Sequence, residues 1–310
     1  ITLSDASEMH VSGNLSFFST AGTSEMSLIR LNQESVLDVG NDMDLTHTGG
    51  TKMWVELNDQ AQWMAGRDIS LNASSANALE IAANNASAIQ LSRDIVRTAP
   101  GYGIVTFNDN STLYLNGNSY LQKLTSSQGS GGDSIRYQNV TIHNTKVTSP
   151  QVTVVDTVEI HGILNLQDGV IGTTSDHLLV LLPTASVNGG SDQSYVEKKK
   201  KKTGNTPFTF PVGQSSNYQP LSIAAPDNIT DAYTAEYFNR NPGESYDTDS
   251  RDEGLHNISG SEYWRLDKET GTTGVQPTIG WNSNSDCVYN LDSIRMAAWN
   301  GSQWQNYGRH

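Results

Sequence analysis

The chain of 310 residues has a formal net charge of −14, with 17% charged and 35% hydrophobic residues. An acidic chain repels the phosphates of DNA and RNA, so we expect no nucleic-acid binding. The single cysteine excludes an internal disulfide and a cysteine-based zinc cluster. No apolar run reaches the roughly 18 residues of a membrane-spanning helix, so we expect no membrane span.

The composition favours strands and turns over helices. Asn, Ser, Thr and Gly are abundant, whereas helical soluble enzymes usually carry more Glu, Lys, Ala and Leu. Val, Ile, Leu and aromatic residues recur throughout, which does not fit disorder. Cys287 stands at an expected strand start, and we interpret it as a small buried hydrophobic residue.

A repeat of about 26 residues covers the first part of the chain. Each copy holds an Asn or Ser, a small residue three positions later, an alternating apolar pair, and then an Asn or Asp. The copies occupy residues 3–15, 31–43, 57–69, 83–95 and 107–119. Apolar residues two apart share one face of a strand, and each short strand buries that face only by stacking on its neighbours. The repeat therefore predicts a β-solenoid.

The asparagine that opens each copy is expected to form a ladder. Stacked coils place equivalent residues about 4.8 Å apart, so amide side chains at one bend can hydrogen-bond to their copies above and below. The candidate ladder residues are Asn32, Asn58, Asn84 and Asn108.

A second column is expected from the acidic residue that ends each apolar pair, at Asp42, Asp68 and Asp94. β-Helical polysaccharide lyases and hydrolases place carboxylates on one solenoid face, and crowded carboxylates raise each other's pKa or need a cation. Asn14 and Asn118 replace Asp at the two ends of the array, which favours a structural role at a turn.

Two other repeat folds fit less well. Helical repeats need apolar residues at i, i+3, i+4 and i+7 over long stretches, whereas these copies alternate at period two. Leucine-rich repeats also carry an Asn at a turn, but their leucine spacing is absent.

The pattern loosens after residue 126, where Gln128–Asp133 is expected to be a flexible loop. Strand-like segments then resume, and we expect the solenoid to continue to about residue 187. These segments are Val140–Ile142, Val152–Val155, Val158–Ile160, Ile163–Leu166 and Leu178–Leu182.

Five of the nine lysines follow one another at Lys198–Lys202. The simplest interpretation is an exposed, self-repelling loop that joins two domains. The functional alternative is contact with an anionic glycan or a membrane surface. A third interpretation is that these positions differ from the native sequence.

The region after Thr203 is richer in aromatic residues and is expected to form a β-sandwich. Asn300-Gly301 between two tryptophans predicts a hairpin turn. Four tryptophans could form a sugar-stacking platform, but core positions are the more common outcome for such residues. The expected strands are Phe208–Phe210, Leu221–Ile223, Tyr233–Phe238, Glu262–Leu266, Val275–Trp281 and Ile294–Trp299.

An acidic stretch in this region is a candidate Ca²⁺ loop, because Ca²⁺ prefers clustered carboxylate oxygens. Its spacing departs from the EF-hand and lacks the mid-loop glycine, and a solvated loop is the alternative. The candidate ligands are Asp247, Asp249, Asp252 and Glu253. We expect no other cofactor.

Several segments resemble modules of large secreted surface proteins of Bacteroidota, which are often exported by the type IX secretion system. The segments that carry the resemblance are Gly204–Gly213, Tyr218–Leu221, Glu262–Leu266 and Met296–Trp304, with Tyr137–Ile142 and Gly162–Ile171 resembling the preceding β-helical part. Such proteins usually have a small residue within the stretch that is Lys198–Lys202 here. The resemblance implies adhesive, gliding or matrix roles at the cell surface and no catalytic residues.

Together these observations predict an all-β chain. We expect a right-handed β-helix (β-solenoid) over residues 1–197, a linker over 198–204 and a β-sandwich domain over 205–310. The expected function is that of an extracellular structural or adhesive protein, a segment of a stalk, filament or adhesin, and not an enzyme. The alternative is a carbohydrate-binding or polysaccharide-degrading β-helix protein.

The expected partners follow from the same fold. The chain starts inside a repeat at Ile1, and an open stacking end suits a longer fibre or a continued solenoid. We therefore expect other copies or further domains of the same surface assembly as partners, with glycans as a second kind.

Overall fold

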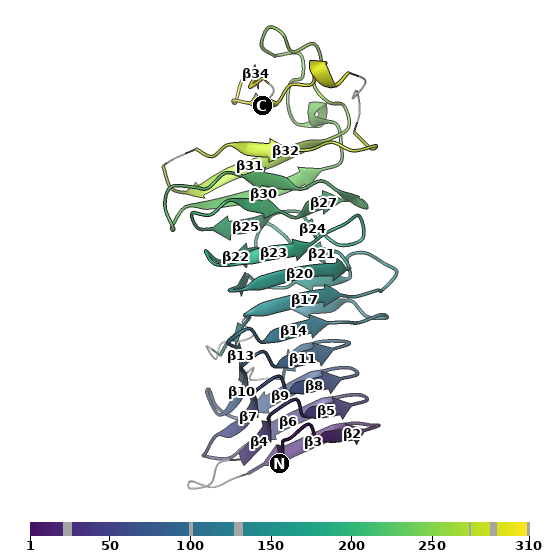
Figure 1. Cartoon of the computed structure of the whole chain (residues 1–310), viewed down its shortest axis with the longest axis vertical. Coiled ribbons are helices and arrows are strands. Elements are labelled where there is room, and N and C mark those ends of the chain that lie inside the picture. The colour runs from purple at the N-terminus through teal and green to yellow at the C-terminus, as the bar shows by residue number, and fades with distance from the viewer. Residues whose placement is uncertain (21–26, 99–101, 127–132, 273, 286–289, 309–310) are drawn as a thin grey trace.

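The computed structural model describes the chain except residues 21–26, 99–101, 127–132, 273, 286–289 and 309–310. Short strands stack into an elongated body with the two termini at opposite ends (Figure 1). Regular helix within the described ranges is limited to two 3₁₀ turns, η1 (Pro242–Glu244) and η2 (Leu291–Ser293). The expectation for Cys287, and most of the loop expected at Gln128–Asp133, lie outside the described residues.

The fold is a β-solenoid, as the repeat predicts. Successive coils give one strand each to three parallel sheets. The first sheet contains β1 (Thr2–Leu3), β4 (Ser27–Leu31), β7 (Met53–Leu57), β10 (Leu79–Ala83), β13 (Ile104–Phe107) and β16 (Ile135–Arg136). The second contains β2 (Glu8–Val11), β5 (Val36–Val39), β8 (Gln62–Ala65), β11 (Ala88–Leu91), β14 (Thr112–Leu115), β17 (Asn139–His143), β20 (Ile163–Asp168) and β23 (Ser186–Gly189). The third contains β3 (Leu15–Ser19), β6 (Met43–His47), β9 (Ile69–Ala73) and β12 (Ile95–Arg97).

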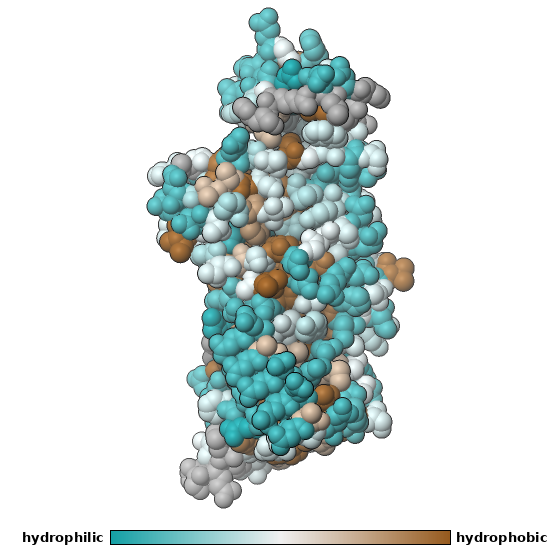
Figure 2. Space-filling view, in the orientation of Figure 1, coloured by the Kyte–Doolittle hydropathy of each residue, from teal (hydrophilic) through white to brown (hydrophobic). Residues whose placement is uncertain are grey.

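The register between coils follows the sequence repeat. In the second sheet, Leu37 pairs with Trp63, Trp63 with Ile89, and Ile89 with Leu113. All four side chains are buried and belong to one continuous apolar core. The outward residues of the same strands are polar more often than not, and the lower part of the visible surface is largely hydrophilic (Figure 2). Alternation at period two thus sorts each strand into an inner and an outer row.

Two further sheets continue the stack toward the C-terminus. The fourth sheet contains β15 (Gln122–Leu124), β18 (Val152–Val154), β21 (Ile171–Gly172), β24 (Val196–Glu197), β27 (Val212–Gln214) and β28 (Asn217–Tyr218). The fifth contains β19 (Val158–Ile160), β22 (Leu179–Leu181), β25 (Lys200–Thr203), β30 (Ala232–Phe238) and β31 (Tyr263–Thr270). Parallel pairing extends past residue 197, because Val196 of β24 pairs with Val212 of β27.

The C-terminal strands are antiparallel and consistent with a sandwich. The sixth sheet contains β26 (Phe208–Phe210), β29 (Leu221–Ile223) and β32 (Pro277–Ile279). Strands β33 (Ala297–Trp299) and β34 (Trp304–Asn306) form the predicted hairpin, with Gly301 at a φ of 105° in its turn. Strand β25 pairs in parallel with β22 and antiparallel with β30, so this region is joined to the solenoid within one sheet.

Candidate functional site

The four ladder asparagines lie in one column at the turn between the first and second sheets. The Nδ2 of Asn58 donates to the Oδ1 of Asn32 at 3.0 Å, and that of Asn84 donates to Asn58 at 3.1 Å. Asn108 donates to Asn84 at 3.0 Å and accepts a bond from the guanidinium of Arg136 at 3.3 Å. Each inner amide both donates and accepts, so the column links four successive coils.

Substituting Asn58 by alanine should lower the free energy of unfolding by about 2 kcal/mol, since it removes two side-chain hydrogen bonds of roughly 1 kcal/mol each. It also leaves an acceptor on Asn32 and a donor on Asn84 without their partner. Asn72→Ala is the matched control, because Asn72 lies on the outward row of β9 in the same coil. Urea denaturation measures both variants, and equal losses would contradict a stabilising ladder.

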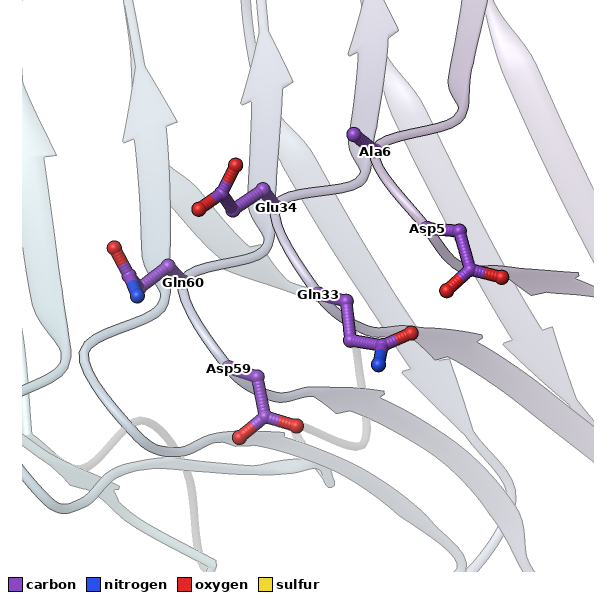
Figure 3. A pocket seen from close by; sticks show the side chains of 6 residues that line it. All are labelled: Asp5, Ala6, Gln33, Glu34, Asp59 and Gln60. Atoms are coloured by element: carbon purple, nitrogen blue, oxygen red, sulfur yellow. The ribbon is translucent and has the colours of Figure 1, made fainter.

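The two residues after each ladder asparagine form a tight turn with positive φ. Gln33 and Glu34 have φ values of 53° and 60°, and Asp59 and Gln60 have values of 55° and 67°. The N–H of Glu34 donates to the carbonyl of Asp59 in the next coil at 3.0 Å. Figure 3 shows the side chains in two rows, with Asp5, Gln33 and Asp59 on one side of the ridge. They line a shallow hollow of about 370 Å³ but point outward without converging, which indicates a structural ridge.

The aspartate column lies at the turn between the second and third sheets, and its carboxylates bind backbone. The Oδ1 of Asp42 accepts the N–H of Asp68 at 3.2 Å, and that of Asp68 accepts the N–H of Asp94 at 2.9 Å. The Oδ1 of Asp94 accepts the N–H of Lys123 at 2.6 Å. Each carboxylate therefore fastens its coil to the next one.

Arginines neutralise part of this column. Arg67 lies 3.5 Å from Asp42, and Arg93 lies 3.3 Å from Asp68. Burial raises the pKa of the Asp94 carboxyl, and the charge of Asp68 adds to the rise while the Lys123 N–H opposes it. The column resembles a set of backbone caps more than a pair of exposed carboxylates for acid–base chemistry.

The four acidic residues of the candidate Ca²⁺ loop do not gather around one point. Asp247 accepts the N–H of Asp249 at 3.0 Å within its own turn. Asp252 accepts from the Nε2 of Gln303 at 2.6 Å and from the N–H of Asn306 at 2.9 Å, so it fastens the β33–β34 hairpin. No group of three or more His, Cys, Asp or Glu suited to a metal ion occurs in the described part of the chain. The residues expected as ligands, Asp247, Asp249, Asp252 and Glu253, are thus not assembled as a Ca²⁺ site.

Three lysines of the run, Lys200–Lys202, belong to strand β25, whereas an exposed linker loop was expected over residues 198–204. Lys200 and Lys202 face inward and are 0% and 2% exposed, while Lys199 and Lys201 face outward. Lys199 forms ion pairs with the carboxylates of β31, at 2.9 Å from Glu269. Of the five lysines, two are buried and a third is paired, so Lys198 and Lys201 are the ones left for the alternative contact with an anionic glycan or a membrane surface.

The two buried lysines have different surroundings. The Nζ of Lys202 donates to three carbonyls, those of Leu182 at 2.6 Å, Pro183 at 3.0 Å and Ala185 at 2.9 Å. The Nζ of Lys200 has one hydrogen bond, to the carbonyl of Val196 at 2.6 Å. A buried ammonium group needs hydrogen-bond acceptors in place of water. Lys202 has three such acceptors and Lys200 has one.

Both lysines replace apolar residues of the solenoid core. Lys200 is in register with Leu179, and Lys202 with Leu181, one coil earlier. Five identical lysines carry no alternation of polar and apolar residues, so no pattern within the run could have found this burial.

The tryptophans of the C-terminal region do not share one flat platform. Trp304 is buried and packs 5.8 Å from Trp299, between ring centroids. Trp264 packs 5.4 Å from Tyr237 and donates its Nε1 proton to a backbone carbonyl. Trp281 is 48% exposed. Two of the four rings therefore belong to the packed interior.

A polar hollow of about 410 Å³ lies where β16 ends the first sheet and β19 begins the fifth. The two strands are joined there by an isolated bridge between Tyr137 and Ile160. The hollow is lined by Ser126, Ser134, Ile135, Arg136, Thr157, Glu159 and His161. Sequence reasoning missed it, because its charged residues come from different coils and match no motif.

Within the described residues, no helix has the length and apolar character needed to cross a bilayer. No family model, no curated protein and no solved structure matches the chain.

Proposed function

We propose that the chain is a structural segment of an extracellular or cell-surface assembly, such as a stalk, filament or adhesin, and that it is not an enzyme. The observation that carries the proposal is the stack itself, in which eight parallel strands follow one another in a single sheet. Each coil contacts only its neighbours, so such a body forms an extended, stiff spacer.

The polar columns support a structural role. Asparagine amides and aspartate carboxylates that recur along the repeat bond neighbouring coils. Groups held in this way stabilise the stack and are poorly placed to act on a substrate.

The wider setting is part of the same proposal. The segments that resemble Bacteroidota surface proteins, together with the scarcity of cysteine and charge, favour secretion by a type IX route. Further domains or other copies of the assembly are the proposed partners, and glycans are a second kind of partner.

Two measurements test this function. Antibodies against the chain should label intact cells that produce it, and labelling only after lysis would contradict the proposed location. Incubation with a panel of polysaccharides should release no reducing ends. Release that disappears in the Asp68→Asn variant would overturn the structural role in favour of a polysaccharide-degrading enzyme.

A further inference from the structure

We propose that the hollow between β16 and β19 binds one acidic sugar unit, a uronate, of a polysaccharide. Arg136 would take the sugar carboxylate, and Glu159, His161 and the hydroxyls of Ser126 and Thr157 would take its hydroxyl groups. This goes beyond the structural role, because it gives the solenoid a ligand site of its own.

The hollow lies beside the bridge between Tyr137 and Ile160, where the end of β16 meets β19. The N–H of Ile135 in β16 donates to the carbonyl of Ser126 at 2.7 Å, so Ser126 lies against this end of β16. Ser126 is itself fixed, since its N–H donates to Asp156 at 2.7 Å and its Oγ donates to the carbonyl of Thr157 at 2.6 Å. The hollow is therefore held open by a hydrogen-bonded rim.

The charged groups come from two neighbouring coils. One N–H of the exposed Arg136 is used by Asn108 at 3.3 Å, which ties the side chain to the end of the asparagine ladder. The guanidinium keeps further donors, whose fork geometry suits a carboxylate. Glu159 lies one coil further on and can only accept hydrogen bonds when ionised, as sugar hydroxyls require.

The imidazole of His161 completes the polar lining. Burial lowers its pKa, and the positive charge of Arg136 adds to this effect while Glu159 opposes it. His161 is therefore neutral at pH 7 and offers one donor and one acceptor. A neutral imidazole suits hydroxyl groups better than a second anion.

The lining selects among ligand classes. Six of the seven described residues that line the hollow have polar side chains, which can hydrogen-bond to the hydroxyl groups of a sugar. A phosphate monoester carries about 1.5 to 2 negative charges at pH 7, more than the single charge of a uronate, and would meet Glu159 with one arginine to offset it. A neutral sugar would leave the guanidinium without a counter-ion. The volume lies near the lower end of the roughly 300–1,000 Å³ of small-ligand sites, which suits a single sugar unit.

Isothermal titration calorimetry with trigalacturonate and with neutral galactotriose tests this site. We expect trigalacturonate to bind and galactotriose to bind at least tenfold more weakly. Arg136→Gln should weaken trigalacturonate binding tenfold or more. Arg136→Lys should weaken it less, because lysine keeps the positive charge but loses the paired N–H donors of the guanidinium.

The matched control is Arg30→Gln. Arg30 lies on the outward row of the same sheet, where it pairs with Glu56 at 2.6 Å, far along the stack from the hollow. No binding of trigalacturonate, equal binding of both sugars, or equal loss in the Arg30→Gln and Arg136→Gln variants would each overturn the site. Those outcomes leave cell-surface labelling unchanged, so they are distinguishable from failure of the proposed function.

Discussion

Replacing Lys200 by methionine is expected to stabilise the chain by about 1–4 kcal/mol, the range seen when buried charged groups give way to apolar residues of similar volume. The Lys200 side chain is 0% exposed, has one hydrogen bond and stands in register with Leu179. Methionine fills a similar space and adapts to irregular gaps. Urea denaturation at pH 7 gives the difference in the free energy of unfolding.

The gain should shrink as the pH rises. Burial lowers the pKa of Lys200 well below its ordinary value, although Glu236 and Glu197 act in the opposite direction. At pH values between the lowered pKa of Lys200 in the folded chain and its ordinary pKa in the unfolded chain, the unfolded chain binds a proton that the folded chain does not, so the stability of the parent protein increases with pH. Burial also lowers the pKa of Lys202, to about 8, but this contributes equally to both proteins.

Lys201→Met is the matched control, because Lys201 lies on the outward row of the same strand. We expect it to change the free energy of unfolding by less than about 0.5 kcal/mol, as is usual for surface substitutions. Destabilisation by Lys200→Met, or a gain that grows with pH, would show that burial does not disfavour the charged form of Lys200.

Replacing Trp63 by alanine should destabilise the chain by about 3–5 kcal/mol, the range for a large aromatic side chain removed from a packed core. Trp63 is fully buried between Leu37 and Ile89 of the neighbouring coils. Ala61 and Ala65 flank it in its own coil and leave room for the indole. The neighbouring coils are held by backbone ladders, so they cannot collapse into the space that it leaves.

Trp54 provides a matched control in the same coil. It lies on the outward row of β7, half-buried, with the ammonium of Lys52 at 4.5 Å from its ring centroid. Trp54→Ala should cost about 1 kcal/mol, mainly from the lost cation–π contact and partial burial. Similar losses for Trp54 and Trp63 would contradict the assignment of inner and outer rows.

The repetitive part of the fold was predictable because each coil repeats the same physical requirement. Apolar residues at period two identified the inner rows, and the asparagine after each first strand identified the bend. Because the pattern recurs in successive coils, an irregular residue in one coil does not hide it. The positive φ of residues such as Glu34 was not predictable, since the turn is held by the next coil and not by its own sequence.

The lysine run shows where composition is misleading. Five consecutive charges suggest a loop, yet Lys200 and Lys202 continue the inner rows of Leu179 and Leu181. The backbone ladder with β22 and β30 fixes the strand, and the alternation then forces every second side chain inward. Pairing with the neighbouring strands therefore overrides the tendency of consecutive lysines to form an exposed loop.

The candidate sites were less predictable than the scaffold. Clustered acids in sequence suggested Ca²⁺, but Asp247 and Asp252 turn to different partners, one local and one in the hairpin at residues 297–306. The hollow brings together Arg136 of β16, Glu159 of β19 and His161, which follows β19. Such a site depends on which residues of different coils become neighbours, and no motif within a single coil indicates this.

Disulfide cross-linking tests the coil register most directly. In a Cys287→Ser background, cysteines at Gln62 and Ala88 are register partners on adjacent coils, about 4.8 Å apart along the stack, within the roughly 4.4–6.8 Å that a disulfide spans. Cysteines at Val36 and Ala88 share the same row but lie two coils apart, about 10 Å. The first pair should cross-link readily under mild oxidation and the second should not. Equal yields for the two pairs, or none for the first, would contradict the stacked solenoid.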